Sequence, residues 1–170
     1  MSEGYLKFYK KCNKKYDKLV KQAAALAKKW HKGQVDKAGV DYFKGHLTTV
    51  GSAGFSWQQK VVGYLHDVAE DTPHTVTEII DVLKEKSDGL LSANDANEIA
   101  TALNLLNSKT ANSREEYIAR IKENFVAAKV KLIDLRHNMD ISRLPHPTDE
   151  DLARIERYKC EYEQISAYFK

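Results

Sequence analysis

Apolar residues recur at helical spacing along most of this chain. Between Tyr5 and Trp30 they follow the i, i+3, i+4 pattern of an amphipathic helix, with Asn13 as a candidate point of division. Alternating β-branched patterns are scarce, and the chain holds only three prolines and eight glycines. The spacing therefore predicts an all-α fold. The opposite face of the first helix, expected to be solvated, carries Lys7, Lys11, Lys14, Lys18 and Lys21.

Helix boundaries are marked by capping residues and prolines. Thr75–Glu78 and Ser113–Glu116 have the spacing of capping boxes, Thr148 is a candidate cap, and Pro145 and Pro147 stop the helix before them. Residues 31–45 show no period and hold three glycines, which predicts a long and functional loop. Helices are expected over 57–71, 92–106, 113–123, 125–144 and from 148 nearly to 170, with one of about three turns after Thr75 and a short one opening at His46.

Length and composition indicate an ordinary globular chain. The 170 residues favour one domain over 1–170, and no repeat or linker divides them. A net charge of +3 is too small to indicate a nucleic-acid partner. Cys12 and Cys160 form no CxxC pair, and no apolar run approaches the ~20 residues of a membrane span. We therefore expect a cytoplasmic protein without a membrane partner, and a homo-oligomer is left open.

The octet LHDVAEDT, residues 65–72, concentrates ionisable side chains in an otherwise apolar segment. Burying charge is costly unless the charge is paired or bound to a metal. On a continuous helix, His66 and Glu70 would lie one turn apart, as would Asp67 and Asp71. An imidazole beside a carboxylate suits a divalent ion such as Mn²⁺, Fe²⁺ or Zn²⁺. The octet is therefore predicted to supply half of a metal site.

Two further residues are candidates to complete that site. His46 follows the glycine-containing loop, and Asp134 lies along a stripe expected to face inward with Val130, Ile133 and Ile141. The resulting set of two imidazoles and two carboxylates leaves coordination positions open for catalysis. The predicted ligands are His46, His66, Asp67 and Asp134.

The pattern H…HD…D resembles the HD-domain metal-dependent phosphohydrolases. Three segments are more specifically similar to the RelA/SpoT-type alarmone hydrolase domain: HKGQVDKAGVDYFKGH, LHDVAEDT and VKLIDLRHNMD. The matched segments lie within about residues 23–144 and occur in the family's order. The resemblance implies a single all-helical HD domain, like the small alarmone hydrolases. Its implied activity is hydrolysis of the 3′-pyrophosphate of guanosine-3′,5′-bis(diphosphate), ppGpp, usually with Mn²⁺.

The resemblance assigns the metal to the four predicted ligands and the attacking water to Glu70 and Asp71. Glu70, expected one turn from His66, can accept the proton of that water, while Asp71 can orient a neighbouring group. Acidic residues at a helix C-terminus oppose the helix dipole, which favours a functional interpretation of this pair.

Other residues carry over to the substrate. Lys37 and Tyr42 match loop residues near the nucleotide, and a lysine there can offset phosphate charge. Asn138 matches a polar residue near the ribose or phosphate. His31 matches a position close to the site but outside the metal ligands.

Asp36 departs from the resembled pattern. The family often has an arginine there, associated with the purine base. This change keeps another nucleotide or phosphoester, such as a deoxynucleoside monophosphate, as an alternative substrate. A non-catalytic nucleotide- or metal-binding module is the second alternative. His74, His137 and His146 are expected to be structural, and a place for His137 beside a metal ligand is the weaker interpretation.

Overall fold

The computed structural model describes residues 3–169 apart from the side chains of residues 3, 5, 6 and 9. Helices dominate this part of the chain, and it contains no strand beyond an isolated bridge between Val35 and Asp41. The predicted all-α fold is confirmed. The side chains of Tyr5 and Tyr9, which belong to the predicted apolar stripe, lie outside the described residues.

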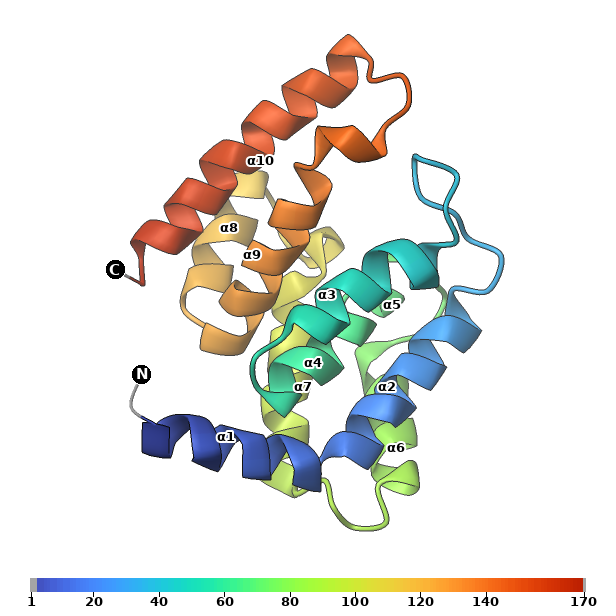
Figure 1. The fold of residues 1–170 in the computed structure, drawn as a ribbon, viewed down its shortest axis with the longest axis vertical. Coiled ribbons are helices and arrows are strands. Elements are labelled where there is room, and N and C mark those ends of the chain that lie inside the picture. The colour runs from blue at the N-terminus through green and yellow to red at the C-terminus, as the bar shows by residue number, and fades with distance from the viewer. Residues whose placement is uncertain (1–2, 170) are drawn as a thin grey trace.

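The helices are joined mostly by short turns (Figure 1). The α-helices are α1 Glu3–Lys15, α2 Asp17–Trp30, α3 Thr48–Ala53, α4 Trp57–Leu65, α5 Val68–Asp71, α6 Val76–Lys86, α7 Ala93–Leu106, α8 Arg114–Lys122, α9 Phe125–Asn138 and α10 Asp149–Ala167. A π-helical turn, η1 Phe43–Leu47, precedes α3, and the 3-10 turns are η2 Ser108–Thr110 and η3 Ile141–Arg143.

Helix α4 lies at the centre of the core and packs against α2, α3, α7 and α9. Val61, Val62 and Leu65 on α4 are fully buried. Helices α3 and α4 approach closely because glycines meet at their crossing. A Cβ atom added to Gly63 would lie 3.0 Å from the Cα atom of Gly51. This close approach brings η1, at the start of α3, near the end of α4.

Side-chain caps define several helix starts. Thr75 with Glu78 forms a complete capping box, as predicted. Thr148 caps α10 as predicted, and its partner Asp151 completes a second box. The box predicted at Ser113 is only half formed, because the Glu116 carboxylate accepts from the backbone and side chain of Asn112 instead.

Several predicted boundaries are wrong. The first helix divides at Tyr16 rather than Asn13. His46 does not open a helix but lies inside η1, which continues directly into α3. The segment 57–71 is interrupted at residues 66–67, between α4 and α5.

The segment 125–144 also contains a break that was not predicted. Helix α9 ends at Asn138, and Asp140 caps the separate turn η3. Ile141, expected to face inward, is 42% exposed.

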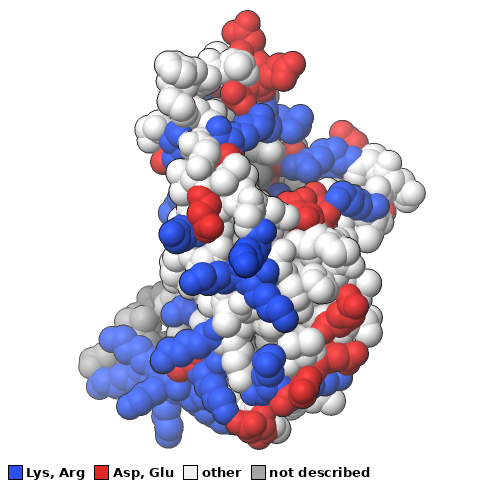
Figure 2. All heavy atoms as spheres, turned by 90° about the vertical axis from the view of Figure 1, so that its right-hand side faces the viewer, with Lys and Arg blue, Asp and Glu red and all other residues white. Residues whose placement is uncertain are grey.

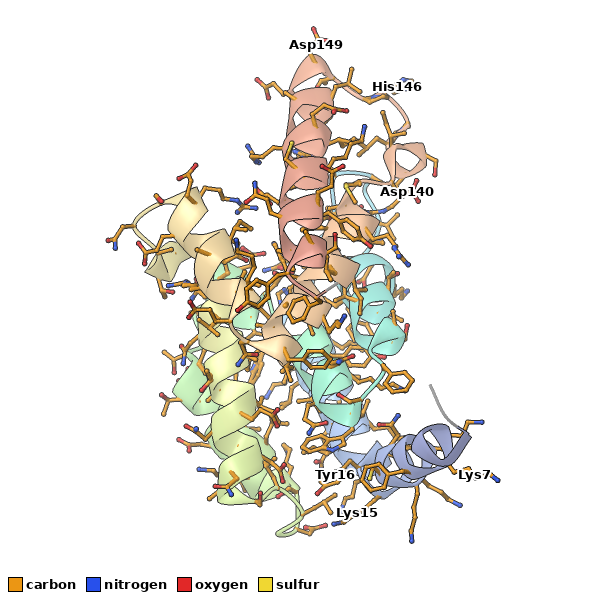
Figure 3. All side chains as sticks on the ribbon, turned by 90° about the vertical axis from the view of Figure 1, so that its left-hand side faces the viewer. Lys7, Lys15, Tyr16, Asp140, His146 and Asp149 are labelled. Atoms are coloured by element: carbon orange, nitrogen blue, oxygen red, sulfur yellow. The ribbon has the colours of Figure 1, made fainter. Side chains whose placement is uncertain are left out.

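The loop 31–45 and the segment after α9 project on the same side of the molecule (Figure 1). Figure 2 views this side and shows charged side chains of both signs around a hollow in its upper half. Asp140, His146 and Asp149 lie at one end of the molecule, whereas Lys7 and Lys15 extend from the other (Figure 3). The described helices include none with the length and apolar character needed to cross a membrane.

Candidate metal centre

The four predicted ligands converge on one point from separate parts of the chain. His46 comes from η1, His66 and Asp67 from the break between α4 and α5, and Asp134 from α9. The Nε2 atoms of His46 and His66 lie 3.3 Å apart. Asp67 Oδ2 lies 3.3 Å from His46 Nε2 and 3.1 Å from His66 Nε2. Asp134 Oδ1 lies 3.4 Å and 3.9 Å from the same two nitrogens.

These separations fit a divalent metal ion. Ligands about 2.1 Å from a central ion lie about 3.0 Å apart at right angles and about 3.4 Å apart in a tetrahedron. The two nitrogens lie 3.3 Å apart, and each carboxylate oxygen lies 3.1–3.9 Å from both of them, close to these values. Among the described residues, the ligand atoms of His46, His66 and Asp134 all lie within 4.8 Å of one another, and Asp67 approaches the two nitrogens of this set. Nitrogen and carboxylate oxygen ligands suit Mn²⁺, Fe²⁺ or Zn²⁺. His46, His66 and Asp134 are also almost fully buried, which favours a site built for a bound ion.

Neighbouring groups hold two of these ligands in position. The Nδ1 atom of His66 lies 2.9 Å from the carbonyl oxygen of Gly63, so Nδ1 carries the hydrogen and Nε2 presents a lone pair. Lys131 donates to Asp134 Oδ2 at 2.8 Å, and Asn138 donates to Oδ1 at 2.6 Å. Asn138, predicted to bind substrate, therefore also orients a metal ligand.

Tyr42 likewise holds the carboxylate of Asp67 in position. Its hydroxyl donates to Asp67 Oδ2 at 2.7 Å. Its ring lies between the rings of His31 and His46, with centroids 5.4 Å and 5.1 Å away. Tyr42 was predicted as a substrate contact, and the structure places it in direct contact with the cluster.

The charges of the cluster favour the ionised form of its carboxylates, which is the form that binds a metal ion. Burial alone would raise the pKa of Asp67, but His66 and His46 outweigh burial and lower it. Lys131 and both histidines likewise outweigh burial and lower the pKa of Asp134. Burial disfavours the charged form of His46, yet Asp67 and Asp134 raise its pKa overall. The two carboxylates and His46 thus each favour the charged form of the other.

Glu70 and Asp71 line the same cavity of about 180 Å³ as the metal cluster, in different environments. Glu70 accepts hydrogen bonds from the Ser108 backbone N–H at 2.8 Å and the Ser108 hydroxyl at 2.9 Å. Asp71 has its pKa raised by burial and by the charges of Asp67 and Glu70. Glu70 is therefore held in one orientation, and Asp71 takes up a proton more readily than an ordinary aspartate.

A second cavity of about 310 Å³ adjoins the cluster. Tyr42, His46, Asn138 and Tyr158 line both cavities. The second cavity is also lined by cationic side chains from three parts of the chain, namely Lys37, Arg143 and Arg154.

Lys37 and Asp36 have specific partners at this second cavity. Lys37 pairs with Asp151 at 3.0 Å, which links the loop 31–45 to α10. Asp36 accepts from the backbone N–H groups of Ala38 and Val40 at 2.9 Å and 3.0 Å and pairs with Arg143. The carboxylate of Asp36 is thus occupied by the loop and by an arginine.

His31 is buried beside the cluster, as predicted, but outside the convergent ligand atoms. Its Nδ1 atom lies 2.7 Å from Gln34 Oε1, and the Gln34 amide donates to the backbone carbonyl of Asp71 at 3.1 Å. His31 therefore connects the start of the loop 31–45 to the segment that carries Asp71.

Three neighbours of the site, Lys131, Ser108 and Arg143, were not predicted, and a fourth, His137, was only the weaker interpretation. Lys131 and His137 flank Asp134 at i−3 and i+3, and the spacing that drew attention to His137 could also have identified Lys131, because a buried carboxylate needs partners on its own helix face. His137, expected to be structural, lies 2.9 Å from His46, and burial, His46 and Arg143 lower its pKa to about 4. Ser108 and Arg143 reach the site from distant parts of the chain, and no local spacing identifies them.

No model of a known protein family matches the sequence. The chain is similar to a curated protein from Myxococcus xanthus named GTP pyrophosphokinase. The two are 29% identical over 148 residues, which cover 81% of this chain and 18% of that protein. This chain therefore spans less than a fifth of its relative's length.

Proposed function

We propose that this chain is a metal-dependent phosphohydrolase that removes the 3′-pyrophosphate of ppGpp, with Mn²⁺ as the ion. One observation carries the proposal: two imidazole nitrogens and two carboxylate oxygens converge at 3.1–3.9 Å in the same cavity as Glu70 and Asp71. Such a combination suits hydrolysis, in which an ion and a proton acceptor must act on one water and one phosphoryl group.

The similarity to a GTP pyrophosphokinase supports an enzyme that acts on nucleotides. A pyrophosphokinase attaches pyrophosphate to GTP, and the proposed reaction removes pyrophosphate from a guanosine nucleotide. The two reactions share a class of nucleotide. Because this chain spans 18% of the relative, the activity in the relative's name need not reside in the matched part.

His46, His66, Asp67 and Asp134 would hold the ion. When bound, a divalent ion supplies Lewis-acid stabilisation to the phosphoryl group under attack. Tyr42 fixes the Asp67 oxygen that faces the two histidines. Lys131 and Asn138 fix Asp134 from both of its oxygens, so the ligand set is largely preorganised.

The carboxylate pair handles the proton of the attacking water. Asp71 is assigned as the proton acceptor because it lines the metal cavity, whereas both carboxylate oxygens of Glu70 accept hydrogen bonds from Ser108. Burial and the charges of Asp67 and Glu70 also raise the pKa of Asp71 above that of an ordinary aspartate. Glu70, held by Ser108, orients the water through its remaining lone pairs. This division reverses the roles expected from the sequence, where Glu70 was the acceptor.

The second cavity would hold the rest of the nucleotide. Its volume of about 310 Å³ falls at the lower end of typical ligand sites. Lys37 and Arg154 share Asp151 as their ion-pair partner, so together they leave a net positive charge that can balance phosphate charge. Tyr158 offers an aromatic face. Asp36 is paired with Arg143. Its carboxylate therefore need not repel a purine or a phosphate.

A substrate panel tests this proposal. The purified chain with Mn²⁺ is offered ppGpp, GTP, NADPH and a deoxynucleoside monophosphate, with Asp67→Asn as the control. Release of pyrophosphate from ppGpp by the unaltered protein alone is the expected result.

Other outcomes select the alternatives. Turnover of another substrate only would contradict the alarmone assignment and retain the phosphohydrolase. Transfer of pyrophosphate from ATP to GTP would instead agree with the relative's name. Bound Mn²⁺ without any turnover would favour a binding module.

A further inference from the structure

A line of contacts runs from the loop 31–45 to the metal ligand His46. Asp36 pairs with the guanidinium of Arg143. The Nη1 atom of Arg143 lies 3.0 Å from His137 Nδ1, and this same nitrogen lies 2.9 Å from His46 Nδ1. The opposite nitrogen of His46, Nε2, faces His66, Asp67 and Asp134.

The chemistry of arginine fixes where the hydrogens lie along this line. A guanidinium donates hydrogen bonds and accepts none. His137 Nδ1 therefore acts as an acceptor and carries no hydrogen. Since two bare nitrogens would repel each other at 2.9 Å, the hydrogen between the two rings belongs to His46 Nδ1. The single lone pair of His137 Nδ1 is then shared between the hydrogens of His46 Nδ1 and Arg143 Nη1. His46 Nε2 is then free to present its lone pair to an ion.

The two metal-binding histidines thus reach the same tautomer by different means. His66 donates from Nδ1 to the carbonyl oxygen of Gly63, three residues earlier in the chain. His46 uses the side chain of His137, 91 residues away. A carbonyl oxygen is always an acceptor, but an imidazole nitrogen is an acceptor only if another group keeps hydrogen off it. Arg143 is the group that keeps hydrogen off Nδ1 of His137, because it donates to that nitrogen.

Arg143 is itself held from both sides. Its Nη1 also donates to the backbone carbonyl of His137 at 3.0 Å, which anchors it to the end of α9. Asp36 holds Nη2 and is in turn fixed by the backbone of Ala38 and Val40. The conformation of the loop 31–45 therefore determines where the guanidinium lies.

We propose that His137 and Arg143 are positioning residues that set the tautomer and ring orientation of His46, with Asp36 coupling them to the loop 31–45. The proposal rests on the proposed function in one respect, namely that His46 holds a metal ion. It assigns Asp36 a role in metal binding in place of an unfavourable contact with the substrate.

Metal affinity, measured without substrate, tests the proposal. His137→Phe keeps a ring but removes the acceptor, and should weaken Mn²⁺ binding about 10- to 100-fold in a calorimetric titration. His137→Asn can offer an amide oxygen to His46 and should recover part of that loss. His146→Phe alters an exposed histidine that lines neither cavity and should leave affinity unchanged (Figure 3).

A reversed ion pair separates positioning from simple loop anchoring. The double variant Asp36→Arg with Arg143→Asp retains opposite charges, but a carboxylate at position 143 would draw a hydrogen onto His137 Nδ1. The reference is Asp36→Arg alone, which loses the same hydrogen bonds to the Ala38 and Val40 backbone. Simple anchoring predicts that restoring the ion pair raises the Mn²⁺ affinity of the double variant above that of Asp36→Arg, whereas positioning by donation predicts no gain. A clear gain would overturn the proposal.

The tautomer itself gives a readout that does not need the metal. Nitrogen NMR of the metal-free protein, at a pH above the titration of its histidines, should show the hydrogen of His46 on Nδ1. The same spectrum of Arg143→Met should show a mixture of tautomers. A His46 hydrogen on Nε2 in the unaltered protein would overturn the proposal while leaving the proposed function intact. Failure of the unaltered protein to bind Mn²⁺ would overturn both.

Discussion

At the scale of single residues, the site separates groups that hold an ion from groups that handle a proton. Asp67 contacts both histidines and Tyr42. Glu70 and Asp71 line the same cavity, and Glu70 is held by Ser108. Substitutions in these two sets should therefore have different consequences.

Asp67→Asn should abolish Mn²⁺ binding and hydrolysis together, because it removes a charged ligand.

Asp71→Asn should retain the metal but lower kcat by at least about 100-fold, the contribution of a positioned general base. Ser108→Ala should cause a smaller loss, because the backbone N–H of residue 108 still holds Glu70. Calorimetric titration and steady-state kinetics distinguish these cases. An Asp71→Asn variant with full activity would show that the acceptor is elsewhere.

Metal binding should also depend on pH through His46. Asp67 and Asp134 raise the pKa of this imidazole above 6.5 in the metal-free state, despite burial. A proton on Nε2 competes with the ion, so Mn²⁺ affinity should be constant above the raised pKa. Affinity should fall about tenfold per pH unit below that pKa. Titrations of Mn²⁺ binding from about pH 5.5 to about pH 8.5 cover the range in which histidine titrates, and they measure this pH dependence directly. Constant affinity down to pH 5.5 would contradict the account.

At the scale of elements, the site depends on the crossing of α3 and α4. Gly51 and Gly63 meet there, and His46 and His66 lie within a few residues of the two glycines. The distance between these helices therefore sets the distance between two metal ligands.

Gly63→Ala should separate the two helices. The added Cβ atom would lie 3.0 Å from both Gly51 Cα and the carbonyl oxygen of Val50. We expect a loss of about 1–3 kcal/mol in the free energy of unfolding and weaker Mn²⁺ binding. Gly4→Ala is the matched control, because its Cβ atom meets nothing within 4 Å. Denaturant unfolding of both variants, with metal titration, measures the effect. Equal stability and affinity for the two variants would contradict the role of this crossing.

Sequence periodicity predicted the elements better than the breaks between them. The helices after Thr75 and Thr148 were found because their caps have local signals. The break at His66–Asp67 and the end of α9 at Asn138 lack a proline or glycine to mark them. Both breaks lie where side chains must turn toward the cluster, so tertiary contacts outweigh local helix propensity there.

The four residues that the structure brings together followed from chemistry and from family-like motifs, but their surroundings did not. Lys131 lies on the same helix as Asp134, three residues earlier, so the spacing of the two residues could have predicted their contact. Arg143 meets Asp36 across 107 residues, and Ser108 meets Glu70 across 38. Contacts of that range depend on how α9, η2 and η3 pack, which a single sequence does not reveal.

At the scale of the whole molecule, the ion would join parts of the chain that are far apart in sequence. The four ligands come from η1, the α4–α5 break and α9, and Lys37 connects the loop 31–45 to α10. A metal that binds only the folded chain stabilises all of these contacts together.

Mn²⁺ should therefore raise the melting temperature. At an ion concentration of 100 times Kd the gain is about 2.7 kcal/mol, or roughly 5–10 °C for a chain of this size. Asp67→Asn, which should not bind the ion, should show no shift. Differential scanning calorimetry with and without Mn²⁺ gives both values, and equal shifts for the two proteins would place the ion elsewhere.

The central claim is that His46, His66, Asp67 and Asp134 form a metal-dependent hydrolytic centre. The most direct measurement is pyrophosphate release from ppGpp by protein first stripped with a chelator and then given Mn²⁺. The account predicts no release by the stripped protein, restored release on addition of Mn²⁺, and none from Asp67→Asn under either condition. Release by the stripped protein, or by Asp67→Asn at the unaltered rate, would contradict it.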